Sequence, residues 1–428
     1  MGRFVLAGFV SCLALCLAAP VVGAEDDKGE IAKLRQEVSE LKAAMLEQDI
    51  NAYLAETNAW EGAQGGDGLK GVTLHADFVV VMQGTLGQSD PASDIAIADG
   101  FFDLNFDLQV NDRVSLFLYL TANNGGFGSF PIQYFATSIS GAPTLAGFND
   151  GIGVNGTAPT NPGAVTTNEA GVRVATHLGD TVLNWEMGEI DPRKRFMQNS
   201  FVPNNHETFL HNSFTDLASF NWLTNLGGTT SLGWYMWLDL GDQKQFKLSW
   251  GWFNTPGEWF KNGQLYVELA WKGEVSGREM NVKVTFSWDE FNPGIDDDTI
   301  VIGGVWDWWL TEKIGVFFMG GFNTEDTANV VDYDFSFGFI FMGMVESRPD
   351  DQFGAGFVFT HVNSNVLTVT EDTEFGFEVY YRFALGDGKV FVTPHFMFII
   401  DPGGGQAPGG FFVDDSLFIV GIRMHVPF

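Results

Sequence analysis

The chain has 428 residues, with 22 Lys and Arg against 54 Asp and Glu, and a formal net charge of −32. Nucleic-acid binding is therefore not expected, because it needs clustered cations that neutralise phosphates. The 41 Phe, 13 Trp and 52 Gly are typical of tilted membrane strands with aromatic girdles and tight turns. After the N-terminus, no segment approaches the roughly 18 continuous apolar residues of a membrane helix.

The N-terminus predicts an export signal. A positive charge opens the chain, residues 4–19 are almost wholly apolar, and residues 22–24 (Val-Gly-Ala) have the pattern of a cleavage site. We therefore expect a signal peptide over residues 1–24, which would remove both Cys12 and Cys16. Lipid attachment through one of these cysteines is the weaker alternative, because neither has suitable flanking residues.

Residues 25–58 are expected to form a periplasmic helix with a short coiled coil. Apolar residues recur there at alternating spacings of three and four: Ile31, Leu34, Val38, Leu41 and Met45. A lone amphipathic helix lying on the barrel or on a partner is the alternative. Several glycines mark residues 59–71 as a linker.

From residue 72 to residue 428 the apolar pattern has the period of a β-strand. Phe102, Leu104 and Phe106 alternate with polar residues, and the same alternation recurs at 280–288 and 375–383. About a dozen such segments, many about ten residues long, favour a membrane barrel over a soluble sandwich.

The lengths of the connections predict the number of strands. Short turns, expected on the periplasmic side, fall at 111–112, 179–180, 241–243, 273–278, 311–312, 346–351 and 386–388. They alternate with longer connections only if residues 191–230 form one excursion on the outer side. We therefore predict an all-β fold, a transmembrane antiparallel β-barrel of about 16 strands, five before the excursion and eleven after it. An extra hairpin within 215–235 would raise the count to about 18.

Two parts of the chain resemble the OprB-type carbohydrate-selective porins. They are FGFEVYYRF, VTPHF, IIDPGGG and FIVGIRMHVPF near the C-terminus, and the stretch from Gly188 to Phe214. The resemblance implies a sixteen-stranded outer-membrane barrel, a homotrimer, and passive diffusion of sugars or other small polar solutes without a cofactor. Two features differ from the family pattern: the strongly negative net charge and the insert at 123–168. They weaken the expectation of sugar selectivity more than the expectation of the fold.

The excursion 191–230 is the candidate pore constriction, because third external loops of such barrels commonly fold inward. Its candidate residues are Asp191, Arg193, Lys194, Arg195, His206, Glu207, His211, Asp216, Asn221 and Trp222. Mixed charges there would set a transverse field and bind sugar hydroxyls. Alternatively, the basic residues bind lipopolysaccharide phosphates or brace the loop.

Strand alternation assigns a second group of charged residues to the lumen, the interior of the barrel. They are Asp103, Asp107, Arg173, Glu268, Lys283, Glu374, Glu378, Arg382 and Arg423. Facing lipid instead would cost about 2–4 kcal/mol for an Arg or Lys at the bilayer midplane. Aromatic candidates for a sugar path are Tyr119, Tyr235, Trp237, Tyr266 and Tyr380, which otherwise belong to the interface girdles.

Four functions compete. A carbohydrate-leaning diffusion porin is the first, and a general cation-leaning porin is the second. The third is an outer-membrane hydrolase, for which the sequence contains no supporting motif. The fourth is a structural barrel plugged by residues 123–168. We expect no enzymatic activity, cofactor or metal, and we expect outer-membrane lipid, lipopolysaccharide and small polar solutes as partners.

Overall fold

The chain divides into two compact units, residues 1–70 and residues 71–428. The computed structural model describes residues 71–86, 96–123, 165–179, 181–203, 207–215, 217–220, 231–241, 244–254, 263–289, 299–324, 331–362, 373–401 and 416–428. The predicted signal peptide and coiled coil, and the linker up to residue 70, lie outside these ranges and stay predictions. Within these ranges, no helix is long and apolar enough to span a bilayer.

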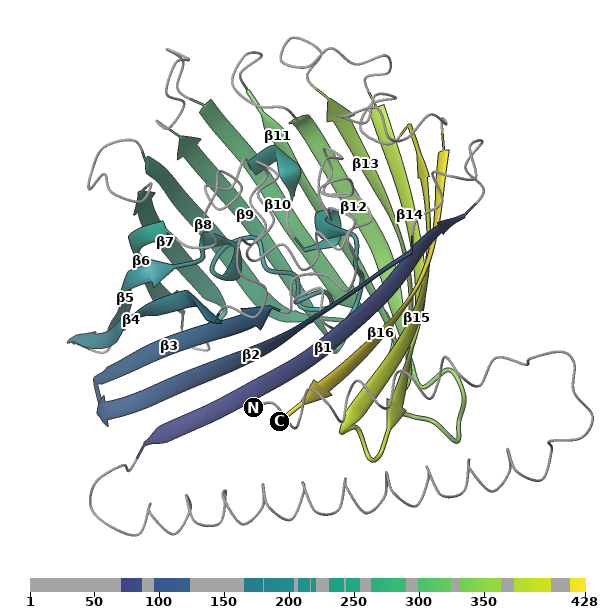
Figure 1. The fold of residues 1–428 in the computed structure, drawn as a ribbon. Coiled ribbons are helices and arrows are strands. Elements are labelled where there is room, and N and C mark those ends of the chain that lie inside the picture. The colour runs from purple at the N-terminus through teal and green to yellow at the C-terminus, as the bar shows by residue number, and fades with distance from the viewer. Residues whose placement is uncertain are drawn as a thin grey trace, which may run out of the picture. The chain divides into compact units, whose positions relative to one another are not determined.

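Sixteen antiparallel strands close into a barrel (Figure 1). They are β1 Val72–Leu86, β2 Ala96–Asn111, β3 Val114–Asn123, β4 Val165–Leu178, β5 Thr181–Ile190, β6 Ser231–Leu240, β7 Phe246–Asn254, β8 Gly263–Val275, β9 Arg278–Asp289, β10 Thr299–Trp309, β11 Ile314–Asn323, β12 Val331–Met342, β13 Gln352–Val362, β14 Thr373–Leu385, β15 Val390–Ile400 and β16 Ser416–Pro427. Each strand pairs with its neighbours in sequence, and β1 closes the barrel on β16, with Phe78 opposite Val426. The predicted sixteen-stranded barrel is confirmed, and because β5 pairs directly with β6, no further hairpin enters the wall among the described residues.

The excursion between β5 and β6 folds into the barrel, as Figure 1 shows. Its described part contains three short 3₁₀ helices: η4 Pro192–Lys194, η5 Asn212–Phe214 and η6 Ala218–Phe220. Five strands precede it and eleven follow, in the predicted order. The interior of the barrel is therefore partly filled by its own chain.

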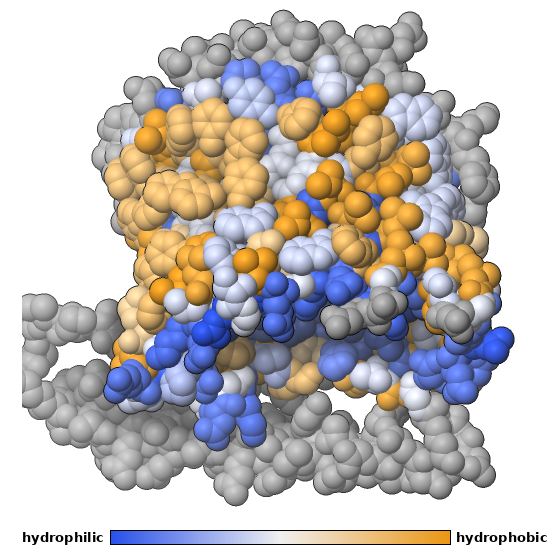
Figure 2. Space-filling view, turned by 180° about the vertical axis from the view of Figure 1, so that it is seen from behind, coloured by the Kyte–Doolittle hydropathy of each residue, from blue (hydrophilic) through white to orange (hydrophobic). Residues whose placement is uncertain are grey.

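The two faces of the strands differ as the alternation predicts. On β13, Phe357 is 52% exposed and the next residue, Val358, is 2% exposed. On β9, Val284 is 55% exposed and Thr285 is fully buried. Figure 2 shows the result, a broad hydrophobic band across the outer surface with a hydrophilic strip below it. An apolar band of this kind suits lipid tails.

Aromatic residues of the excursion pack on the inner wall. Phe196 and Phe220 join a cluster with Tyr235, Phe253 and Tyr266 of the wall. A second cluster brings together Phe201, Phe209, Phe214, Phe317 and Tyr380. Wall glycines allow this close approach, since a Cβ added at Gly356 would lie 2.6 Å from the ring of Phe214. The barrel's hydrophobic core thus lies beneath the excursion.

Candidate pore constriction

Carboxylates on the inner wall accept hydrogen bonds from the backbone of the excursion. The N–H groups and their acceptors are Asp191 with Glu169 (2.8 Å), Met197 with Glu268 (2.8 Å), Ser200 with Asp307 (3.1 Å), Leu210 with Glu378 (2.8 Å) and His211 with Glu378 (2.9 Å). Hydrogen bonds to charged groups contribute about 1.5–3 kcal/mol each. The excursion is therefore fixed to the wall at several points.

The far end of the excursion is held by β14, β15 and β16. His395 Nδ1 lies 2.7 Å from a Glu378 oxygen, so this buried carboxylate is contacted from two sides. Arg423 donates to the Thr208 carbonyl oxygen at 2.8 Å. The segment around Thr208 is thus held against strands β14, β15 and β16, whereas η4 lies against β2, β4 and β5.

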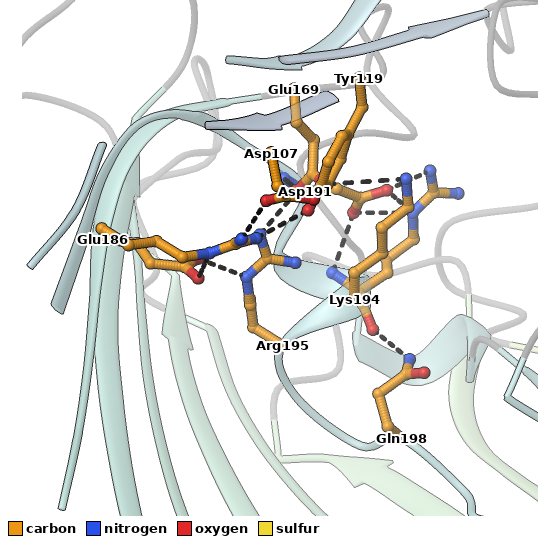
Figure 3. A network of polar contacts seen from close by, with 10 residues as sticks. Asp107, Tyr119, Glu169, Glu186, Asp191, Lys194, Arg195 and Gln198 are labelled. Atoms are coloured by element: carbon orange, nitrogen blue, oxygen red, sulfur yellow. Dashed lines mark hydrogen bonds and ion pairs between the residues drawn. The ribbon is translucent and has the colours of Figure 1, made fainter. Parts of the chain in front are cut away.

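The near end of the excursion lies in a network of ion pairs with β2, β4 and β5 (Figure 3). The pairs are Arg173 with Asp107 (2.5 Å) and Glu186 (2.7 Å), Arg195 with Glu186 (2.7 Å) and Glu169 (3.2 Å), Arg193 with Asp191 (2.8 Å), and Lys194 with Glu169 (3.8 Å). We call these eight residues the ion cluster. Four cations face four carboxylates, so the ion cluster is charge-balanced within a strongly acidic protein.

Arg195 is the centre of the ion cluster. Burial opposes its charged form, but Glu169 and Glu186 more than offset this and hold the pKa of the Arg195 guanidinium above its usual range. The arginine therefore stays charged under all ordinary conditions. Its two carboxylate partners orient it, so the network presents fixed hydrogen-bond donors and acceptors.

Two aromatic side chains lie at or near the ion cluster. Tyr119 contacts it directly, and Trp237 stacks on Tyr235, which pairs with Glu186 in the register of β5 and β6. Tyr119 and Trp237 are partly buried and pack against the first hydrophobic cluster. Arg173 donates to the Tyr119 hydroxyl at 2.8 Å, and Lys247 Nζ lies 5.3 Å from the Trp237 ring centroid. Both rings therefore combine a partly exposed apolar surface with a nearby cation.

The other aromatic candidates do not line an open path. Tyr235, Tyr266 and Tyr380 face inward but are at most 2% exposed, because the excursion covers them. These three tyrosines therefore neither line a path for sugars nor lie in the aromatic girdles at the membrane surface.

The charged candidates on the inner wall differ in how far the excursion covers them. Some stay half-buried: Asp103 and Asp107 on β2, and Arg173 on β4. Lys283 on β9 donates to the Gln198 carbonyl oxygen of the excursion. Glu207 lies 3.5 Å from Arg382. The inward residues beneath the excursion are Glu268, Glu374, Glu378 and Arg423, each at most 2% exposed. His206, Asp216, Asn221 and Trp222 lie outside the described residues.

Sequence reasoning missed several wall carboxylates, among them Glu186, Asp307 and Glu169, and also Asp334, which accepts a hydrogen bond from the Ser219 hydroxyl. Glu186 follows the alternation of β5, where Trp185 and Met187 face outward, so the pattern was sufficient to find it. Asp307 likewise alternates with Trp306 and Trp308 on β10. Glu169 adjoins a register shift between β3 and β4, which interrupts the alternation.

A family model described as "Carbohydrate-selective porin, OprB family" matches residues 306–428. A structure of OprB from Pseudomonas putida at high pH aligns with 84% of this chain and 94% of its own, at 16% identity and a TM-score of 0.64. The C-terminal part of this chain, residues 306–428, is therefore similar to the OprB family of porins. Its resemblance to the family, expected from the sequence, is confirmed.

Two further proteins are similar to this chain. Porin B of Pseudomonas aeruginosa is 24% identical over 243 residues, which are 46% of this chain and 52% of Porin B, so the match spans about half of that relative. The structure of the outer membrane channel DcaP of Acinetobacter baumannii aligns with 83% of this chain and 97% of the DcaP chain, at 11% identity and a TM-score of 0.51. The family and the fold together support an outer-membrane porin.

Proposed function

We propose that this porin lets small uncharged polar solutes, carbohydrates in particular, diffuse passively across the outer membrane. The observation that carries the proposal is the charge-balanced ion cluster beside Tyr119 and Trp237. Fixed donors and acceptors suit sugar hydroxyls, and a flat apolar ring suits the C–H face of a pyranose. The description of the matching family, carbohydrate-selective porin, supports the same class of solute.

A general cation-leaning porin is the second candidate. The net charge of −32 favours it, because an acidic protein attracts cations through its mean field. However, Glu268, Glu374 and Glu378 are buried beneath the excursion and do not line an open path. The part of the inner wall that stays accessible to solutes is therefore less negative than the net charge of −32 suggests.

Swelling of liposomes that contain the purified full-length protein tests the proposal. We expect rapid swelling with neutral monosaccharides, and sugar-dependent reduction of ion conductance in planar bilayers. Steady cation-preferring conductance with no effect of sugar would favour the second candidate. Folded protein with no conductance and no swelling would refute both and favour a plugged barrel.

A further inference from the structure

Three polar side chains surround Trp237 on the inner wall of the barrel. Trp237 and Asp239 lie on β6, and Asn184 lies opposite Trp237 on β5. Lys247 lies on β7, directly opposite Asp239. The alternation that buries Tyr235 in the interior also turns these four side chains inward, and all four are half-buried. We call Asn184, Trp237, Asp239 and Lys247 the Trp237 site.

The Trp237 site lies between the ion cluster and the short turn that follows β6. Glu186 of the ion cluster is opposite Tyr235, and from there β6 runs through Trp237 and Asp239 to the turn at 241–243. A solute that moves along this part of the wall, between the ion cluster and the end of the barrel with the short turns, therefore meets the Trp237 site.

The polar groups of the Trp237 site are not used up by the protein itself. Asn184, Asp239 and Lys247 form no hydrogen bond or ion pair with any residue that the structure describes. In the ion cluster, by contrast, the charged groups pair with one another, as Arg195 does with Glu186 (Figure 3). The Trp237 site thus offers solutes the hydrogen-bonding capacity that the ion cluster spends on its own members.

Asp239 and Lys247 are held apart although they are cross-strand neighbours. Side chains at such positions are close enough to pair. Lys247 Nζ instead lies 5.6 Å from the ring centroid of Tyr235 and 5.3 Å from that of Trp237. A cation–π contact at a partly exposed site is weaker than a hydrogen bond to a charged group, so a solute hydroxyl can recruit the ammonium.

The three polar groups together match the hydroxyls of a sugar. The Asp239 carboxylate only accepts hydrogen bonds, the Lys247 ammonium only donates them, and the Asn184 amide does both. A hydroxyl is itself both a donor and an acceptor. Adjacent hydroxyls of one solute molecule can therefore bind to the carboxylate, the ammonium and the amide at the same time.

The indole of Trp237 adds a requirement for shape. It stacks on Tyr235 with ring centroids 5.1 Å apart and an interplanar angle of 26°, which fixes its orientation, and it stays partly exposed. A pyranose has a rigid apolar C–H face that can lie on such a ring, whereas an open-chain polyol with the same kind of hydroxyls has no rigid face. The Trp237 site therefore discriminates by ring form.

We propose that the Trp237 site binds the pyranose ring of a monosaccharide in preference to an open-chain polyol of similar size. Trp237 contacts the C–H face of the sugar, and Asp239, Lys247 and Asn184 bind its hydroxyls. This inference rests on the proposed passage of small polar solutes. It goes beyond that function by naming the class of solute that the pore selects and the residues that select it.

Block of ion conductance by glucose and by sorbitol, in planar bilayers with the full-length protein, tests the proposal. We expect glucose to half-block wild-type channels at a several-fold lower concentration than sorbitol. Trp237→Leu should remove this difference. Trp250→Leu, on the outward face of β7 next to the buried Ser249, is the matched control and should keep it. Equal block by both solutes in the wild type, or a glucose preference that survives in Trp237→Leu, would overturn the proposal.

A second variant tests the polar groups and does not alter the ring. Lys247→Met keeps the length of the side chain and removes its donors, and Lys272→Met, near the end of β8, removes an exposed ammonium that pairs with Glu279. Heat-dependent gel mobility checks that each barrel folds. We expect Lys247→Met alone to raise the half-blocking concentration of glucose about tenfold. An unchanged value, or an equal rise in Lys272→Met, would overturn the proposal.

Liposome swelling separates failure of this inference from failure of the proposed function. Equally fast entry of glucose and sorbitol, without preferential block by glucose, would overturn the inference and leave passive diffusion of polar solutes intact. Entry of neither solute into liposomes that contain folded protein would overturn both.

Discussion

The backbone N–H of Leu210 donates to the Glu378 carboxylate at 2.8 Å, although 168 residues separate the two. Leu210 lies in the inward excursion and Glu378 on β14. The position of the excursion therefore depends on a strand that lies far from it in the sequence. The geometry at the ion cluster is a property of the whole barrel, not of the loop sequence alone.

Glu378→Gln should loosen the far end of the excursion. Glutamine keeps one acceptor oxygen but loses the charge that strengthens the bonds to Leu210 and His211. We expect a loss of about 1.5–3 kcal/mol in the free energy of unfolding, and a larger, noisier single-channel conductance. Urea unfolding in detergent and planar-bilayer recording measure the two effects. Glu274→Gln, at an exposed position, is the control and should change neither.

Gly356→Ala should displace the excursion by steric contact. The added Cβ would lie 2.6 Å from the Phe214 ring and 3.2 Å from that of Phe209, both in a packed cluster. Overpacking of this kind costs about 1–3 kcal/mol. We expect a lower unfolding midpoint and an altered conductance. Gly304→Ala, on the outward face, serves as control; an effect there as large as at Gly356 would contradict the steric explanation.

Protonation of His211 should destabilise the protein in acid. Burial lowers the pKa of its imidazole to about 4, an effect that nearby Glu378 only partly offsets. Since the unfolded pKa is about 6.5, the unfolded state binds more protons between about pH 6.5 and 4, and stability falls as the pH falls through this window. The contribution is about 3 kcal/mol. His211→Gln should flatten this part of the urea-midpoint profile against pH, and an unchanged slope would refute the assignment.

Neutralising one member of the ion cluster should shift ion selectivity in a direction set by its sign. Arg173→Gln leaves the ion cluster one charge more negative, and Glu186→Gln leaves it one charge more positive. A unit charge about 6 Å from a passing ion in water changes its energy by about 0.7 kcal/mol, or roughly threefold in permeability. Reversal potentials in a KCl gradient should move toward cation preference in the first variant and away from it in the second. Shifts of the same sign would exclude this explanation.

The strand number, the closure of the barrel and the directions of most side chains were predictable from the sequence. Each depends on local signals: alternation along β9 and β14, short turns such as 241–243, and an even strand count. A one-residue change of register would turn every side chain of a strand to the other face, so the apolar pattern alone fixes inward and outward positions. Where a register shift interrupts the pattern, as beside Glu169, the prediction fails.

Only the tertiary structure decided which inward residues stay accessible. The alternation places Asp103 and Glu378 on the same face of the wall, yet the first is half-buried and the second is fully buried beneath the excursion. The difference arises because the excursion, anchored by Glu268, Asp307 and Glu378, covers one part of the wall and not another. Contacts between residues that lie about 70 to 170 positions apart leave no periodic trace in the sequence.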